Sequence, residues 1–104
     1  MSTRLELLKR YLIEDPSDSF LRYAIAMEYI SSNDQNDALE QLKNLINDDP
    51  DYLAAYYMAA KAAENLNLIP LARKFYETGI SVATMQKDLH TASELRAALE
   101  MIEE

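Results

Sequence analysis

The sequence predicts an all-α protein, and three observations indicate this class. Among its 104 residues glycine occurs once and proline three times, so the chain has little turn or strand chemistry. Residues that favour helices, chiefly alanine, leucine and glutamate, are abundant. The third observation is a repeat, because LKRYLIEDP at 8–16 returns 34 residues later as LKNLINDDP at 42–50. Self-similarity at one interval predicts a structural unit that is used twice.

The first two predicted helices are defined by apolar residues and by the polar residues around them. The first carries an apolar stripe of Leu5, Leu8 and Leu12. It should run to about Glu14, because the Asp-Pro pair that follows stops a helix. The second has the sequence FLRYAIAMEYI at 20–30, can be capped by Ser17 or Asp18, and should end in the polar stretch after it.

The third and fourth helices are predicted from a cap and from composition. Asp34 is the expected N-cap of the third helix, which should end at NDDP, 47–50. The fourth, LAAYYMAAKAAENL at 53–66, is rich in alanine and therefore intrinsically helical.

The fifth and sixth helices complete the set of six. Asn67 can cap the fifth, and Pro70 falls in its first turn, where a missing N–H costs little. Gly79 lies inside this helix at a cost of about 1 kcal/mol relative to alanine, so it should mark a close helix contact rather than a ligand site. The sixth begins near Asp88 or Thr91 and should bury one face, made of Leu89, Ala92, Leu95, Leu99 and Ile102. Short connections predict that consecutive helices pack as antiparallel neighbours.

These positions resemble the tetratricopeptide repeat family over nearly the whole chain. The family's 34-residue helix–turn–helix unit has the pattern W-x2-L-G-x2-Y, then A-x3-F, then P. In 17–50 these slots hold Ile25-Ala26, Tyr29, Ala38-x3-Leu42 and Pro50, with Arg22 in the tryptophan position. In 51–84 they hold Tyr56, Ala59-Ala60 and Ala72-x3-Tyr76, with Ala63 and Thr84 in place of the tyrosine and the proline. The small residues in these slots let helix backbones approach closely.

The resemblance implies a short right-handed α-solenoid of antiparallel helix pairs, with one domain over 1–104. The expected parts are an N-terminal capping half-repeat (1–16), two repeats (17–50 and 51–84) and a C-terminal capping helix (85–104). The half-units at the two ends should cover the stack, as solenoids require.

Composition and charge narrow the classes of function. Ten basic and eighteen acidic side chains give a net charge of −8, which argues against nucleic acid or an anionic membrane as the main partner. The chain has no cysteine, and hence no disulfide, thiolate nucleophile or zinc–cysteine site. An N-terminus without an apolar signal core, and no apolar run near the roughly 18 residues of a membrane span, favour a soluble cytoplasmic protein.

The residues that carry chemistry do not form a recognisable catalytic or metal-binding pattern. His90 is the only histidine and has no evident catalytic partner in the sequence. The cluster of Asp48, Asp49 and Asp51 lacks the central glycine and terminal glutamate of a calcium loop, so helix termination explains it better. A single glycine leaves no Gly-rich phosphate loop. We therefore expect a protein that is not an enzyme and that needs no cofactor or metal.

The second predicted helix is apolar on two opposed faces. One stripe, Ile25, Ala26 and Tyr29, should meet the third helix. A surface helix needs only one apolar face, so something must also bury the opposite stripe of Phe20, Tyr23, Met27 and Ile30. The fourth helix repeats that stripe in diluted form, as Ala54, Tyr57, Lys61 and Glu64. The resemblance places this side in a concave groove that binds peptides, so the candidate binding residues are Phe20, Tyr23, Met27, Ile30, Tyr52, Tyr57, Lys61 and Glu64.

Three interpretations of this stripe remain open. It could bind a partner protein, pair with a second copy in a homodimer, or be covered by neighbouring helices of the same chain. The first predicts a non-catalytic adaptor or scaffold, and the second a homo-oligomeric assembly subunit. Lys61 is the only basic residue on the stripe, which is too little for a carboxylate clamp. A surface of tyrosine and methionine instead favours an apolar or mixed peptide.

Overall fold

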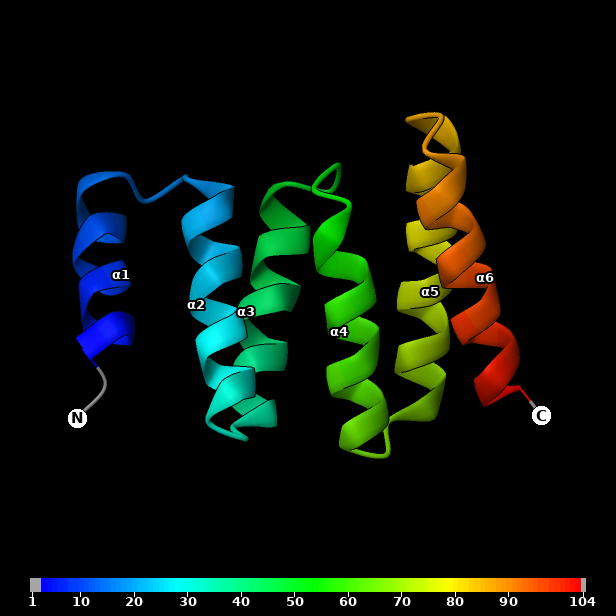
Figure 1. Ribbon diagram of the computed structural model, residues 1–104, viewed down its shortest axis with the longest axis horizontal. Helices are drawn as coiled ribbons and strands as arrows, with labels where there is room; N and C mark the ends of the chain where they lie inside the picture. Colours follow the sequence, from blue (N-terminus) through cyan, green and yellow to red (C-terminus); the bar gives the residue numbers. More distant parts are fainter. Residues whose placement is uncertain (1–2, 104) are drawn as a thin grey trace.

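The computed structural model describes residues 3–103, and within this range the chain folds into six helices. They are α1 (Thr3–Glu14), α2 (Ser19–Ser31), α3 (Gln35–Asp48), α4 (Ala54–Asn65), α5 (Ile69–Met85) and α6 (Leu89–Ile102). Figure 1 shows them side by side, running alternately up and down from one end of the molecule to the other. The predicted all-α class and the predicted number of helices are confirmed. Residues 1, 2 and 104 of the expected end pieces lie outside the described range.

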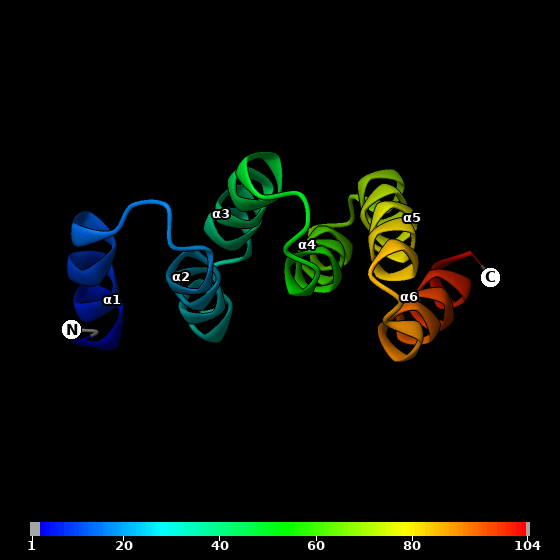
Figure 2. The same cartoon turned by 90° about the horizontal axis from the view of Figure 1, so that it is seen from above.

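Extensive packing occurs only between helices that follow one another in sequence. Seen from above, α2, α4 and α6 lie along one side of the molecule, whereas α3 and α5 lie along the other (Figure 2). We call these the α2–α4–α6 side and the α3–α5 side. This arrangement is a solenoid that measures 40 × 29 × 20 Å. Among residues 3–103 no helix is long and apolar enough to cross a membrane.

Helix starts agree with the predicted caps at three of four places. Asp18 caps α2, because its Oδ1 accepts a hydrogen bond from the Leu21 amide at 3.0 Å. Asp88 caps α6 by accepting from the Thr91 amide at 3.1 Å and from the Thr91 hydroxyl at 2.8 Å. The backbone bond first, and then the hydroxyl bond, lower the pKa of Asp88. Asp34 occupies the N-cap position of α3, although its side chain makes no capping hydrogen bond.

The prediction that Asn67 caps α5 is wrong. Leu68 occupies the N-cap position, and Asn67 precedes it with a φ of 63°. Asn33, which lies 34 residues earlier in the turn between α2 and α3, has nearly the same φ of 59°. Asparagine tolerates this left-handed conformation better than most residues, because its short side chain can hydrogen-bond locally. Asn67 therefore shapes the turn rather than the helix start.

Small side chains hold the helices close together. The alanines in the repeat slots, Ala26, Ala38, Ala59, Ala60, Ala63 and Ala72, are fully buried. Gly79 of α5 marks a tight contact, since a Cβ at this position would lie 2.9 Å from Tyr56 Cβ and 3.1 Å from Leu95 Cδ1. Gly79 thus lies between α4 and α6 at a separation that admits no side chain. This confirms the prediction of a close helix contact at Gly79.

The two faces of α2 are buried differently from the prediction. Ala26 lies in the main core with Leu39 and Leu42 of α3, as expected. Ile25 instead joins Leu8 of α1 in a second, smaller cluster, against which Tyr29 also packs. The expectation that all three residues meet α3 is therefore wrong for Ile25 and Tyr29. The reason is that α2 lies between α1 and α3 and must bury one side against each (Figure 1).

Leu89 is the second correction to the predicted core. Ala92 and Leu95 of α6 are buried, and Leu99 and Ile102 pack against the main core, as predicted. Leu89 is 71% exposed. At about 100° per residue, Leu89 lies roughly a quarter-turn away from the centre of the buried stripe of α6. The first turn of this helix therefore presents Leu89 to solvent.

Candidate interaction surface

The predicted stripe on α2 is partly buried inside the molecule. Phe20 is 66% exposed, but Tyr23 and Met27 pack against the main core, and Ile30 is half-buried. The Tyr23 ring lies against that of Tyr52, just before α4, with centroids 5.7 Å apart. Burial, and then the neighbouring Tyr52, raise the pKa of Tyr23. On this stripe, Phe20 is thus the residue that offers most of its side chain to a partner.

The predicted residues of α4 form a chain of contacts among themselves. Lys61 Nζ lies 5.5 Å from the centroid of the Tyr57 ring and 3.7 Å from a carboxylate oxygen of Glu64. Glu64 also accepts a hydrogen bond from the hydroxyl of buried Tyr76 in α5. The Tyr76 ring meets Tyr57 edge-on at 6.2 Å. Burial, reinforced by the Glu64 bond, raises the pKa of Tyr76. Glu64 is therefore engaged within the chain, whereas Tyr57 keeps one side open.

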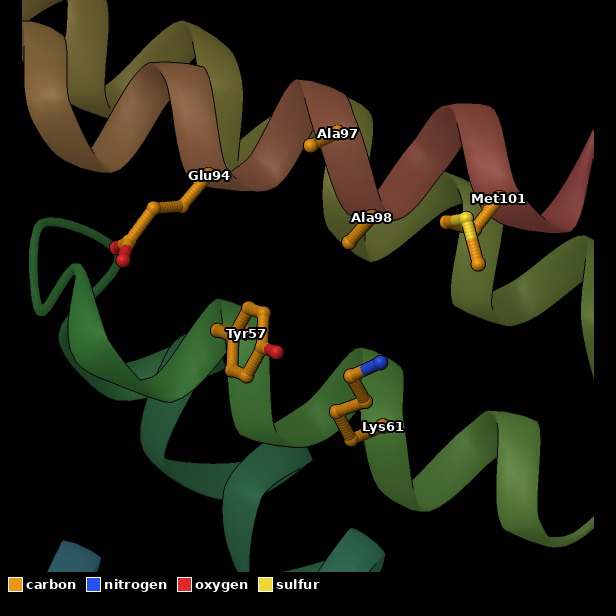
Figure 3. A pocket seen from close by; sticks show the side chains of 6 residues that line it. All are labelled: Tyr57, Lys61, Glu94, Ala97, Ala98 and Met101. Carbon is orange, nitrogen blue, oxygen red and sulfur yellow. The ribbon is translucent and has the colours of Figure 1, made fainter.

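A hollow of about 480 Å³ opens between α4 and α6 on the α2–α4–α6 side. One wall carries Tyr57 and Lys61 from α4, and the other carries Glu94, Ala97, Ala98 and Met101 from α6. Figure 3 shows Tyr57 and Lys61 pointing toward α6, with Glu94 and Met101 pointing toward α4. The two alanines leave space along the α6 wall, and Met101 is 71% exposed. The hollow therefore has a mixed lining, in which the apolar atoms of Tyr57, the alanines and Met101 lie beside one charge of each sign.

The α6 wall of this hollow is absent from the sequence-based site, which treats α6 only as a cap. Two signals in the sequence could have indicated it. Met101 is a large apolar residue that falls outside the buried stripe of α6, and the adjacent Ala97-Ala98 pair offers space rather than bulk. The remaining predicted residues do not line the hollow; they are Phe20, Tyr23, Met27, Ile30, Tyr52 and Glu64.

The aspartates between α3 and α4 have structural partners. Asp49 accepts a hydrogen bond from the Ser19 hydroxyl at 2.5 Å, and Asp48 forms an ion pair with Arg22 at 3.0 Å. These two contacts tie the start of α2 to the end of α3. Arg22, which stands in the family's tryptophan position, contributes its charge here and is largely buried. In the described part of the chain, no group of three acidic, histidine or cysteine side chains is arranged to hold a metal ion.

His90 lies on the exposed first turn of α6. Its Nε2 is 3.4 Å from a carboxylate oxygen of Glu94, and its side chain is 85% exposed. A histidine in this setting has water on most sides and no buried nucleophile beside it. The geometry favours a surface role for His90.

Comparison with known proteins gives relatives with this fold. No family model matches the chain. The solution structure of a tetratricopeptide repeat domain protein from Salinibacter ruber is 36% identical, with a TM-score of 0.81, over 86% of this chain and 90% of that one. A crystal structure of a tetratricopeptide repeat domain protein from the same organism is 35% identical, with a TM-score of 0.78, over 83% and 96%.

Two further comparisons extend over almost the whole chain. A protein from Bordetella parapertussis has the same fold, with a TM-score of 0.84 at 23% identity, over 99% of this chain and 90% of that one. A TPR repeat-containing protein of Pseudomonas aeruginosa is 24% identical, over 95% of this chain and 94% of its own length.

The fold and these likenesses define the class of the protein as an α-helical repeat built from antiparallel helix pairs. The chain belongs to the tetratricopeptide repeat family, because the Salinibacter ruber relative matches it at 36% identity over 90% of that relative's length. Members of this family are generally non-catalytic modules for protein interaction.

Proposed function

We propose that this protein is a non-catalytic interaction module, an adaptor or scaffold that binds a partner polypeptide on its α2–α4–α6 side. The hollow between α4 and α6 carries this proposal, because it is open and its mixed lining includes partly exposed Tyr57 and exposed Met101. Large apolar side chains that stay in solvent are the anchors that a protein partner buries. Phe20 on α2 extends the same kind of surface.

The lining of the hollow indicates which partner would fit it. Tyr57, Met101 and the alanines of α6 would receive a large apolar side chain of the partner. Lys61 already lies near Glu64, so its charge is partly neutralised and it is a weak anchor for a carboxylate. Glu94, on the opposite wall, would face a polar or basic residue of the partner. The partner segment is therefore apolar at its centre and mixed in charge at its edges.

Three expectations from the sequence belong to this proposal. The chain divides into a capping half-repeat (1–16), repeats 17–50 and 51–84, and a capping helix (85–104). Its partner is a protein rather than nucleic acid or a membrane, in keeping with a net charge of −8. It works in the cytoplasm, which fractionation of the source cell would test.

The test combines a double variant with a matched control. Tyr57→Ser with Met101→Ser should abolish capture of partners from a lysate of the source cell, because truncated interface anchors commonly cost about 2 kcal/mol each. Met85→Ser is the control, since Met85 is also an exposed methionine, at 81% against 71% for Met101, but does not line the hollow. The control should capture the same proteins as wild type. Unchanged capture by the double variant would contradict the proposal.

Two further measurements make the result unambiguous. Thermal melts show whether Tyr57→Ser, whose ring also packs on Tyr76, weakens the fold. Met101→Ser alone removes a side chain that is mostly exposed. Light scattering gives the mass of each variant. If the double variant converts a dimer into a monomer, the surface serves self-association, and the homo-oligomeric alternative replaces the adaptor function.

A further inference from the structure

A second hollow lies on the opposite side of the molecule, between α3 and α5. It has a volume of about 260 Å³ and is lined by Lys43, Ile46, Asn47, Leu71, Lys74 and Phe75. Phe75 is 9% exposed, and Ile46 and Leu71 are half-buried, so these three form an apolar floor. Lys43 and Lys74 are exposed and form the rim. Because α3 and α5 lie together on the side away from α2, α4 and α6, this hollow is separate from the proposed α4–α6 site (Figure 2).

The charges of the two rim lysines stay unpaired in the described part of the chain. Glu40 and Glu77 lie three residues away on the same helices, yet neither Lys43 nor Lys74 forms an ion pair among residues 3–103. The protein as a whole carries a net charge of −8. Two unpaired positive charges at one apolar hollow are therefore a local exception to the charge of the surface. Carboxylates are the groups that such a rim would attract.

The 34-residue interval supplies an internal comparison for this hollow. The positions that correspond to Lys43, Lys74 and Phe75 one interval earlier are Lys9, Glu40 and Gln41. The earlier set therefore has opposite charges and a polar residue where the later set has like charges and an aromatic ring.

Lys9 also has an interaction partner within the chain, because its Nζ lies 5.5 Å from the centroid of the Tyr29 ring. A positive rim over an apolar floor is thus particular to the α3–α5 hollow and does not follow from repeat packing in general.

We propose that the α3–α5 hollow is a second docking site, which takes an acidic segment of a partner protein. A large apolar side chain of that segment packs on Phe75, and carboxylates on both sides of it meet Lys43 and Lys74. The apolar floor distinguishes this ligand from a free phosphate or a nucleic acid backbone, which would gain nothing from Phe75. The protein would then hold partners on both sides of the solenoid.

The test is a titration of the isotopically labelled full chain, followed by amide chemical shifts, with the short blocked peptide Glu-Asp-Leu-Phe-Asp-Glu. We expect shifts at Lys43, Asn47, Lys74 and Phe75, and binding that is at least roughly tenfold weaker in the variant Lys43→Glu with Lys74→Glu. Lys9→Glu is the matched control, because it changes the equivalent lysine one interval earlier, and it should bind the peptide as wild type does.

Control ligands and variants decide between this proposal and simpler explanations. The peptide Glu-Asp-Ser-Ser-Asp-Glu should bind far more weakly, and inorganic phosphate should not displace the original peptide. Equal binding of the serine peptide, or displacement by phosphate, would show diffuse anion attraction and overturn the proposal.

The site and its occupant are tested separately from the proposed function. Tyr57→Ser with Met101→Ser should leave peptide binding intact, so a failure at the α4–α6 hollow is distinguishable from a failure here. Unchanged binding of the Glu-Asp-Leu-Phe-Asp-Glu peptide by the double lysine variant would also overturn the proposal. So would a scattering mass showing that wild type dimerises and that this variant is monomeric, because a second copy would then occupy the hollow.

Discussion

At the scale of single residues, the space available between packed helices, rather than helix propensity, explains why a glycine lies inside α5. Gly79 is the only glycine, and it lies inside the longest helix, where an alanine would ordinarily be more stable by about 1 kcal/mol. Side chains from both neighbouring helices pack against α5 at this point, Tyr56 from α4 and Leu95 from α6. Gly79 thus lowers the local stability of α5 but leaves room for the side chains of α4 and α6 to pack against it.

Gly79→Ala should therefore destabilise the protein by about 1–3 kcal/mol, even though it improves helix propensity. The added methyl would come within 2.9 Å of Tyr56 Cβ, which is held by its own backbone and cannot swing aside. Chemical denaturation of the variant and of wild type measures the effect. Ser81→Ala, at an exposed position of the same helix, is the control and should not lower stability. A Gly79→Ala protein at least as stable as wild type would show that the helices separate freely.

At the scale of helices, the sequence predicts where elements begin better than what each face contacts. Asp18 and Asp88 are recognisable as caps because a cap depends on residues within a single turn. The partners of Ile25 depend on how α1 stacks on α2, which no pattern within α2 contains. For the same reason only two of the six residues that line the candidate site, Tyr57 and Lys61, are predicted from the sequence. Tyr57 follows from the periodicity of α4, whereas Met101 reaches the hollow through the packing of α6 on α5.

Asp88→Ala should lower the melting temperature at neutral pH, because it removes two hydrogen bonds at the start of α6. These bonds hold the pKa of Asp88 below its ordinary value, so they stabilise the fold above that ordinary value, near pH 3.8. Their contribution is lost as pH falls through the lowered pKa of the folded state. The difference between wild type and variant should thus shrink in acid, as thermal melts over a range of pH would show.

Asp34→Ala is the matched control for this effect. Asp34 occupies the same N-cap position on α3, but its side chain makes no capping hydrogen bond. The Asp34 variant should therefore melt closer to wild type than the Asp88 variant does. Equal losses in the two variants would mean that the Asp88 hydrogen bonds add nothing at the helix start.

At the scale of the whole molecule, each helix is stabilised mainly by contacts with the helices before and after it in sequence. Every helix packs mainly on its sequence neighbours, so the end helices have one partner each. The two ends are not equivalent. α6 places Ala92, Leu95 and Ala98 in the main core, whereas α1 buries Leu8 in the small second cluster. The free energy that holds α1 in place is accordingly the smaller of the two.

We expect α1 to open independently of the rest. Amide hydrogen exchange should be fastest in α1, slower in α6 and slowest in α4, which has neighbours on both sides and is buried most completely. Leu8→Ala should speed exchange in α1 and in the α1-facing part of α2, while leaving α5 unchanged. Protection of α1 equal to that of α4 would indicate a single cooperative unit instead.

The matching left-handed turns at Asn33 and Asn67 make the length of this molecule adjustable. Each turn follows one helix and precedes the next with nearly the same backbone angle, 59° and 63°, at positions 34 residues apart. A copy of the segment between them could be joined at Asn67 without any backbone conformation that the chain does not already use. Only one new helix contact would arise, of α4 with a second α3, and it would resemble the existing contact of α2 with α3. Gene duplication could thus extend both sides of the solenoid by one helix pair at a time.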